Sequence, residues 1–168
     1  ADLSQDVLVY EEPDDTFDTY VFKTRSRAYV VIGMSQTVSN EYRFVDAGQP
    51  RSPFRLFEPR QRDHEYRIDH AGDHFYIITN DEATNFRLMR TPVESTGREH
   101  WEEVIAHRDD VLLEDIDPFA QHLVVSERKD GLLRLRIRRW DSPDEHGAEH
   151  YIDFGEPAYL AYTHGNME

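Results

Sequence analysis

Apolar and polar residues alternate along short segments of the chain, most regularly in residues 62–92. Tyr66 and Ile68 alternate with charged neighbours, the period-two pattern of a strand with one buried face. Residues 75–78, Phe-Tyr-Ile-Ile, form a continuous apolar run, which is typical of a strand buried on both faces. Gly72 lies between the two, where a tight turn favours a residue that tolerates positive φ. The segment therefore predicts a small antiparallel meander.

The meander repeats along the chain. First strands are expected near Tyr20, Tyr66, Leu113 and Leu160, in steps of 46, 47 and 47 residues. The other strand positions keep a similar step: second strands at 29–32, 75–78 and 122–125; third strands at Tyr42/Phe44, Phe86/Leu88 and Leu133/Leu135; fourth strands at 54–57, 101–105 and 150–154. A period of roughly 40 to 50 residues with four strands per repeat is typical of a β-propeller blade.

The repeat predicts an all-β chain that forms part of a propeller: about three four-stranded antiparallel blades plus one extra strand. The whole chain, 1–168, is read as one fragment of a propeller domain, with a leading loop over residues 1–18. The blades are expected at 18–60, 63–108 and 110–156, and a further blade begins at 157–168. Residues 101–108 could form a helical turn, but their place in the repeat favours strand. Closed propellers have at least four blades, so the chain either belongs to a larger protein or closes by association.

Composition narrows the function. The formal charge is −15 at pH 7, which disfavours binding to nucleic acid or an anionic membrane and is consistent with a cationic ligand such as a basic peptide. There is no apolar stretch long enough for a membrane helix, and residues 1–6 do not resemble a signal peptide. Cysteine is absent, so a disulfide framework is excluded. These features predict a cytoplasmic protein without a membrane partner.

Nucleophilic catalysis finds little support in the sequence. A nucleophile elbow requires G-x-S-x-G, and Ser35, the serine nearest a glycine, lacks the second glycine. The chain has no thiol, and it contains no glycine-rich phosphate loop. We therefore predict no catalytic residue, no cofactor-binding residue and no cofactor in this chain.

Histidines are numerous and raise the question of a metal site. The candidates fall in two groups: His64, His70 and His74, and His146 and His150 with Asp144 and Glu145. Six residues of extended strand separate the first two by about 20 Å, too far for one ion without a bend. We predict no metal site and expect turn and surface histidines instead.

Two aspartates recur near the ends of the expected innermost strands. Asp69 precedes a turn, and Asp117 precedes Pro118. Carboxylates that project into the channel of a glycosidase propeller act as acid and base, whereas the same residue type caps turns through its side chain. The turn interpretation is favoured, and an inner-channel glycosidase stays a minor alternative.

Several stretches resemble a known family. The runs YVVIGMS, PRQRDHEYRIDHAGDHFYIITNDEATNFRLMRTP, HWEEVI and LVVSERKDGLLRLRI are similar to the propeller domain of the oligopeptidase B (protease II) branch of the prolyl oligopeptidase family of serine peptidases. The resemblance covers residues 6–163, but it includes no catalytic motif. It implies a parent enzyme in which an α/β-hydrolase domain carries the triad and selects arginine or lysine. A seven-bladed propeller would cover that active site and admit only short peptides.

The leading hypothesis is therefore a non-catalytic propeller portion that controls substrate access to a hydrolase domain. Its partners would be the remainder of the propeller, the hydrolase domain and, for the parent enzyme, short basic peptides. The alternative is a stand-alone interaction propeller that closes by self-association. Three blades leave two end faces without a neighbour, so we expect a concentration-dependent dimer whose formation high salt favours.

Overall fold

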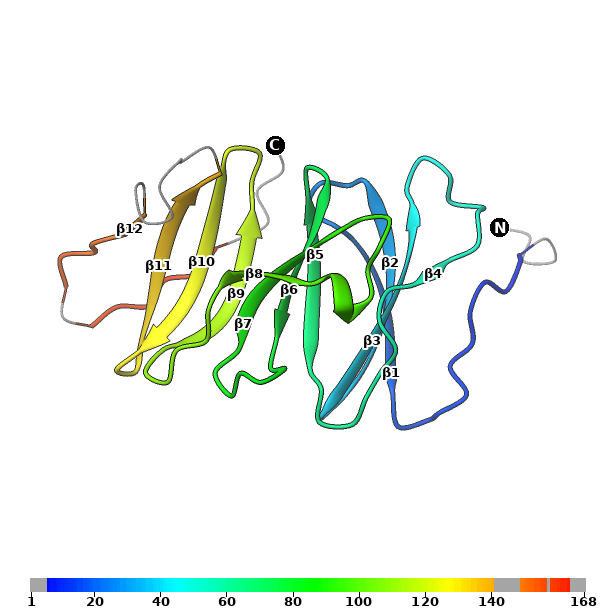
Figure 1. Ribbon diagram of the computed structural model, residues 1–168, viewed down its shortest axis with the longest axis horizontal. Helices are drawn as coiled ribbons and strands as arrows, with labels where there is room; N and C mark the ends of the chain where they lie inside the picture. Colours follow the sequence, from blue (N-terminus) through cyan, green and yellow to red (C-terminus); the bar gives the residue numbers. More distant parts are fainter. Residues whose placement is uncertain (1–5, 141–148, 157, 164–168) are drawn as a thin grey trace.

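The structure, a computed structural model, describes residues 6–140, 149–156 and 158–163. Three four-stranded antiparallel sheets follow one another along the chain (Figure 1). The first sheet contains β1 (Asp18–Lys23), β2 (Tyr29–Gln36), β3 (Ser39–Asp46) and β4 (Arg55–Leu56). The second contains β5 (Tyr66–Ala71), β6 (His74–Thr79), β7 (Arg87–Pro92) and β8 (Glu102–Ile105). The third contains β9 (Leu112–Pro118), β10 (His122–Lys129), β11 (Leu132–Arg139) and β12 (His150–Tyr151).

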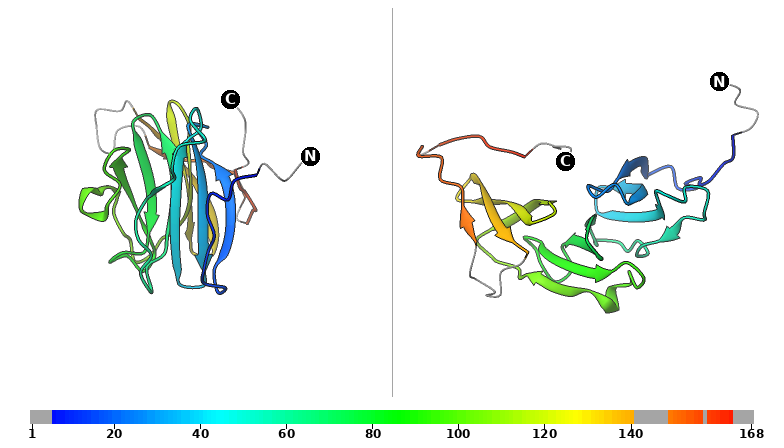
Figure 2. Two further views of the ribbon diagram at one scale, coloured as in Figure 1. Left: turned by 90° about the vertical axis from the view of Figure 1, so that its right-hand side faces the viewer. Right: turned by 90° about the horizontal axis from the view of Figure 1, so that it is seen from above.

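The sheets pack face to face in an open arc rather than a closed ring (Figure 2). Within each sheet the strands are in chain order, so β1, β5 and β9 occupy equivalent edges. This arrangement confirms the predicted fold class and the three four-stranded repeats. Among the described residues the one helical segment is the short 3-10 helix η2 (Arg98–His100). This part of the chain contains no helix long and apolar enough to cross a membrane.

The middle sheet is buried on both faces, as the apolar run in β6 predicts. Phe75 and Ile77 point toward the first sheet, where they join a cluster with Val31, Phe44 and Tyr66. This cluster forms the first interface, between the first and second sheets. Because successive side chains of a strand point to opposite faces, Tyr76 and Ile78, which alternate with these two residues, must point toward the third sheet.

The second interface joins the second and third sheets. Tyr76 and Ile78 of β6 pack there against Leu113, Leu123 and Val125 of β9 and β10. Leu123 and Val125 are completely buried. Four consecutive residues of β6 thus divide between two interfaces, which explains why no polar residue interrupts the run.

The outer face of the first sheet is covered by the segment that precedes β1. Phe17 packs with Ile32 and Met34, and Met34 is completely buried. Glu12 and Arg60 form a two-bond pair at 3.0 and 3.2 Å that ties the segment to the end of the first sheet. This cover corrects the expectation that both end faces of the arc are bare.

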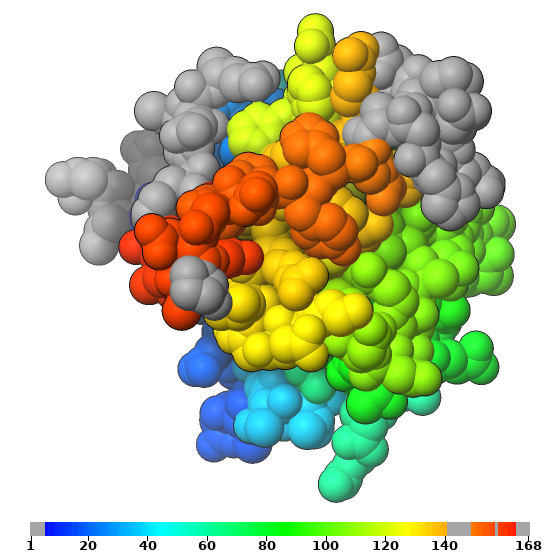
Figure 3. Space-filling model, turned by 90° about the vertical axis from the view of Figure 1, so that its left-hand side faces the viewer, coloured from blue at the N-terminus to red at the C-terminus, as the bar shows by residue number. Residues whose placement is uncertain are grey.

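The outer face of the third sheet is crossed by the chain that follows β12, shown in orange and red in Figure 3. Several apolar side chains of β12 and of this segment stay exposed: Tyr151, Ile152, Phe154, Leu160 and Tyr162. The leading segment also exposes apolar side chains, at Val7, Leu8 and Val9. The two end faces differ in that Phe17 of the leading segment joins a buried cluster, whereas the side chains after β12 belong to no such cluster among the described residues.

The hairpin turns explain why β strands pair in this register. Gly72 has φ 59° in the two-residue turn between β5 and β6, as predicted. Asp130 and Gly131 both have positive φ, 51° and 81°, in the turn between β10 and β11. Positive φ at both positions matches the right-handed twist of the strands, and an Asp-Gly pair adopts it readily.

Three strand predictions need correction. Phe86 does not begin the third strand of its sheet, because it has φ 61° and turns the chain just before β7. The fourth strands are shorter than expected; β4 and β12 contain two residues each. Residues 158–163 form no strand in the structure, and Leu160 is 82% exposed.

Candidate functional site

The edge strands β1, β5 and β9 line the concave side of the arc, which we call the channel face (Figure 2). A cavity of about 380 Å³ on this face is lined by residues of all three strands. Aromatic side chains, Tyr20 and Phe22, come from β1, while aspartates come from β5 and β9. The channel face is thus the part of the described structure where chemically diverse side chains from all three sheets meet.

Asp69 lies in β5 and connects two sheets. Its Oδ1 accepts hydrogen bonds from the backbone N–H of Arg25 and of His70, each at 2.8 Å. Burial raises the pKa of the Asp69 carboxyl, while these N–H donors and the charge of Arg25 act in the opposite direction. Asp69 therefore holds the turn between β1 and β2 against the second sheet, so its bonds extend beyond the local turn that the sequence suggested.

Arg25 extends the connection to the third sheet. Its Nη1 lies 2.5 Å from Oδ1 of Asp117 in β9, and its guanidinium stacks on the Phe119 ring 4.0 Å from the centroid. Both partners of the ion pair are mostly buried, with 16% and 14% of their side chains exposed. The structure thus brings the two predicted aspartates together around Arg25, a residue that the sequence analysis did not single out.

The opposite end of the channel face is arranged around Tyr20. Its ring lies directly over Gly33 of β2, where an added Cβ would come within 2.6 Å of the ring. The Tyr20 hydroxyl lies 3.3 Å from that of Tyr42. Arg67 of β5 borders the same region; its Nη1 is 3.8 Å from the carboxylate of Asp115. Glycine at position 33 therefore allows the Tyr20 ring to lie close against the backbone of β2.

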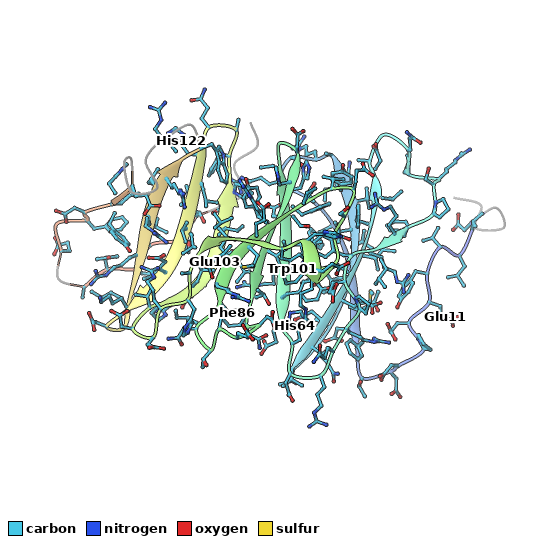
Figure 4. The ribbon with its side chains drawn as sticks, in the orientation of Figure 1. Glu11, His64, Phe86, Trp101, Glu103 and His122 are labelled. Carbon is cyan, nitrogen blue, oxygen red and sulfur yellow. The ribbon has the colours of Figure 1, made fainter. Side chains whose placement is uncertain are left out.

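His64 lies outside the channel face and is buried, contrary to the expectation of surface histidines. It stacks on Tyr66 and lies near Trp101 (Figure 4). Arg98 donates to Nδ1 at 2.7 Å, and because a guanidinium can only donate, neutral His64 carries its proton on Nε2, 3.0 Å from Thr79 Oγ1. Burial, assisted by the charge of Arg98, lowers the pKa of His64 to about 4.

His70 is also buried, and its role differs from that of His64. Its Nδ1 lies 2.8 Å from the hydroxyl of Ser26, and its ring contacts Tyr29 and Phe75. Burial lowers the pKa of His70. The two histidines thus have separate partners, and His150 is exposed in β12. No group of three or more metal-ligating residues occurs in the described parts of the chain; Asp144, Glu145 and His146 lie outside them.

A buried carboxylate occurs in the third sheet. Glu127 is completely buried in β10 and accepts bonds from Arg108, from Arg136 at 2.5 Å and from the Tyr151 hydroxyl at 2.7 Å. These partners come from the chain before β9, from β11 and from β12. Glu127 therefore links β10 to β11, to β12 and to the chain before β9, and these contacts stabilise the third sheet.

Ser35 does not lie on a nucleophile elbow. It is part of β2 and pairs in the ladder with Asp18 and Asn40. An elbow places its serine on a sharp turn between a strand and a helix, which is a different backbone geometry. The candidate site thus consists of the charged and aromatic side chains of the channel face. Their contacts hold the three sheets in position relative to one another.

Comparisons with known proteins agree with this architecture. Residues 1–163 match the family model described as prolyl oligopeptidase, N-terminal beta-propeller domain. Dipeptidyl aminopeptidase BI of Pseudoxanthomonas mexicana is 40% identical over 98% of this chain and 22% of its own length, and Protease 2 of Moraxella lacunata is 29% identical over 95% and 22%. The structure of oligopeptidase B from Leishmania major superposes with a TM-score of 0.82 and 26% identity, over 92% of this chain and 22% of that one.

The chain therefore spans about a fifth of the length of these relatives. The family model matches almost all of the chain, and the TM-score of 0.82 shows that the solved relative shares its fold over this region. Together with the three-sheet arc, these similarities show that the chain belongs to the N-terminal β-propeller domain of the prolyl oligopeptidase family.

Proposed function

We propose that this chain forms part of the channel wall in a serine oligopeptidase and limits which peptides reach the active site. The observation that carries the proposal is the channel face: three edge strands line one cavity, and Arg25 and Asp69 tie their sheets together. A wall held this firmly suits a part that filters substrates by size. The proposal places the catalytic triad in an α/β-hydrolase domain elsewhere in the parent protein.

We further propose that the parent enzyme acts in the cytoplasm and cleaves short peptides after arginine or lysine. Support comes from the relatives named Protease 2 and oligopeptidase B, and from the formal charge of −15. A strongly negative protein attracts cationic peptides and accelerates their association. This attraction weakens as salt screens the charges.

The experiment compares the full-length protein with residues 1–168 alone. Fluorogenic peptides with arginine, lysine or leucine before the reporter group are offered to both. We expect the full-length protein to cleave the first two, to prefer short peptides over long ones, and to lose kcat/KM as salt rises. The isolated chain should be inactive. Equal cleavage of the leucine peptide, or no decline with peptide length, would contradict the proposal.

The second candidate is a stand-alone interaction module that closes by self-association. The observation that favours it is the group of exposed apolar side chains after β12, of which Leu160 is 82% exposed. Sedimentation of residues 1–168 over a hundredfold concentration range, at low and high salt, tests it. A dimer that forms with increasing concentration and salt supports the module, and a monomer under all conditions excludes it.

A further inference from the structure

One contact on the channel face joins two sheets that are not neighbours. Arg25 belongs to the turn after β1 in the first sheet, whereas Asp117 lies near the end of β9 in the third. The second sheet lies between them, since its two faces pack against the other two sheets. Because β1, β5 and β9 lie side by side along the arc, a contact between the ends of β1 and β9 must pass β5 on its concave side or at its end.

The position of the link along the strands is also defined. The turns after β1, β5 and β9 lie at the same edge of the molecule, at the top of Figure 1. Arg25 is in the first of these turns, and its backbone N–H is bonded to Asp69 near the end of β5. The guanidinium therefore reaches across one mouth of the channel rather than across its middle.

The side chain is held in this position from several sides. Phe119, in the turn after β9, stacks against the guanidinium at 4.0 Å, and Asp117 binds one of its terminal nitrogens. Ser26, the next residue of the turn, is bonded to His70 of the second sheet. Only 16% of the Arg25 side chain is exposed, so its packing holds the side chain in place, and the exposed part would be a fixed obstacle to a passing peptide.

The obstacle can nevertheless open. A guanidinium and a carboxylate form their strongest pair through two parallel hydrogen bonds. Here Arg25 and Asp117 share one, and both Nη2 of Arg25 and Oδ2 of Asp117 are buried without a hydrogen-bond partner among the described residues. The three sheets are also held together by two apolar clusters that do not include this pair. Loss of the pair should therefore widen the mouth without separating the blades.

We infer that Arg25, pinned to Asp117, narrows one mouth of the propeller channel and so sets an upper limit on the size of peptides that pass. This inference rests on the proposed function and assigns the size limit to one side chain. Arg25 would be a specificity-determining residue of the wall, remote from the chemical step.

The test uses the full-length protein and a series of quenched fluorescent peptides. All share one cleavable segment and are extended on one side from about 5 to about 40 residues. The variants are Arg25→Met, which keeps the apolar stem but not the charge, Arg25→Lys, and Asp117→Asn, which releases the arginine from the other side. The matched control is Arg55→Met, because Arg55 also stacks on a ring, Phe44, and bonds across the first interface, but from the outer strand β4.

We expect Arg25→Met and Asp117→Asn to raise kcat/KM for the longest peptides by about tenfold relative to the shortest, whose kcat/KM should stay the same. Arg25→Lys should behave between these variants and the wild type, and Arg55→Met should match the wild type. If wild-type cleavage declines with length and neither Arg25→Met nor Asp117→Asn changes that decline, the inference about Arg25 is wrong and the proposed function stands.

Other outcomes separate the two ideas further. A wild-type enzyme that cleaves all lengths equally contradicts the proposed function, and the role of Arg25 fails with it. If Arg25→Met does not fold, as judged by its thermal transition, Asp117→Asn decides the question because it retains the Phe119 contact. If both variants lose kcat/KM by the same factor at every peptide length, the Arg25–Asp117 contact only stabilises the fold, and the inference is overturned.

Discussion

The two interfaces between sheets have the same topology but different chemistry. The first is largely aromatic: Phe44, Phe57, Tyr66 and Phe75 stack or meet edge to face, with centroids 4.9–6.1 Å apart. The second is mainly aliphatic and contains one aromatic pair between Tyr76 and Trp140. Propeller packing thus requires apolar volume at the right positions in the strands, and either kind of side chain can supply it.

The difference matters because aromatic pairs depend on orientation and aliphatic contacts largely do not. Both buried histidines border the first interface, His64 through Tyr66 and His70 through Phe75. The first interface should therefore respond more sharply to changes in shape and to acid.

Truncation of the interface cores gives the largest effect. Phe75 contacts four aromatic rings and is completely buried, so Phe75→Ala should lower the free energy of unfolding by about 4 kcal/mol. Leu123→Ala, at an equally buried position of the second interface, should cost about 3 kcal/mol. Urea unfolding measures both. A larger loss for Leu123→Ala would mean that ring geometry adds nothing to the first interface.

The next effect concerns the third sheet, whose strands are joined by the buried carboxylate of Glu127. Glu127→Gln keeps the shape of the side chain but removes the buried negative charge that Arg108 and Arg136 share, and Arg136 retains Glu149 as its only carboxylate partner among the described residues. We expect a loss of about 3 kcal/mol in the free energy of unfolding. Glu94→Gln is the control, because Glu94 is exposed and lies 3.7 Å from Arg55. Equal, small effects from both variants would contradict a structural role for Glu127.

Acid should weaken the first interface before the second. The pKa of folded His64 is about 4, below the ordinary 6.5, so the unfolded chain binds more protons between these values. Stability from this residue is complete above about pH 6.5 and should fall by about 3 kcal/mol as the pH drops to about 4. His64→Gln should remove this part of the pH dependence. Hydrogen exchange at pH 5 locates the effect; faster exchange confined to β10 and β11 would refute it.

The smallest effect concerns the edge of the first sheet that faces the channel. Gly33→Ala should displace the Tyr20 ring and cost about 1 kcal/mol, because the new methyl group would overlap it. In the Tyr20→Ala background the same substitution should cost much less, and a double-mutant cycle measures the difference. Additive effects would mean that the close approach of ring and backbone is not what selects glycine here.

The sequence predicted the architecture well, because burial in a strand leaves a local trace. Alternation at Tyr66 and Ile68, the apolar run of β6 and the turn at Gly72 are each readable from a few neighbouring residues, and the structure confirms them. The prediction that Phe86 belongs to the third strand was wrong, because its apolar side chain fits the alternation although its backbone turns at φ 61°. Hydrophobicity reports burial but carries no direct information about backbone angles.

The polar ties could not be predicted in the same way. Arg25 and Asp117 lie 92 residues apart, and nothing near either one signals the other. His64 and His70 looked like turn and surface residues because the sequence around them is charged. Their burial depends on the side chains of Trp101 and Tyr29, which lie 37 and 41 positions away in the sequence and reach them only in the folded chain. Such contacts belong to the tertiary arrangement and not to any single segment.

The division of β6 between two interfaces has a consequence for how this domain changes during evolution. Phe75 contacts Phe44, 31 positions earlier, whereas Tyr76 contacts Trp140, 64 positions later. Substitution at either position therefore selects for compensating change in a different sheet. Among homologues, the adjacent positions 75 and 76 should vary independently of each other, and each should covary with its distant partner.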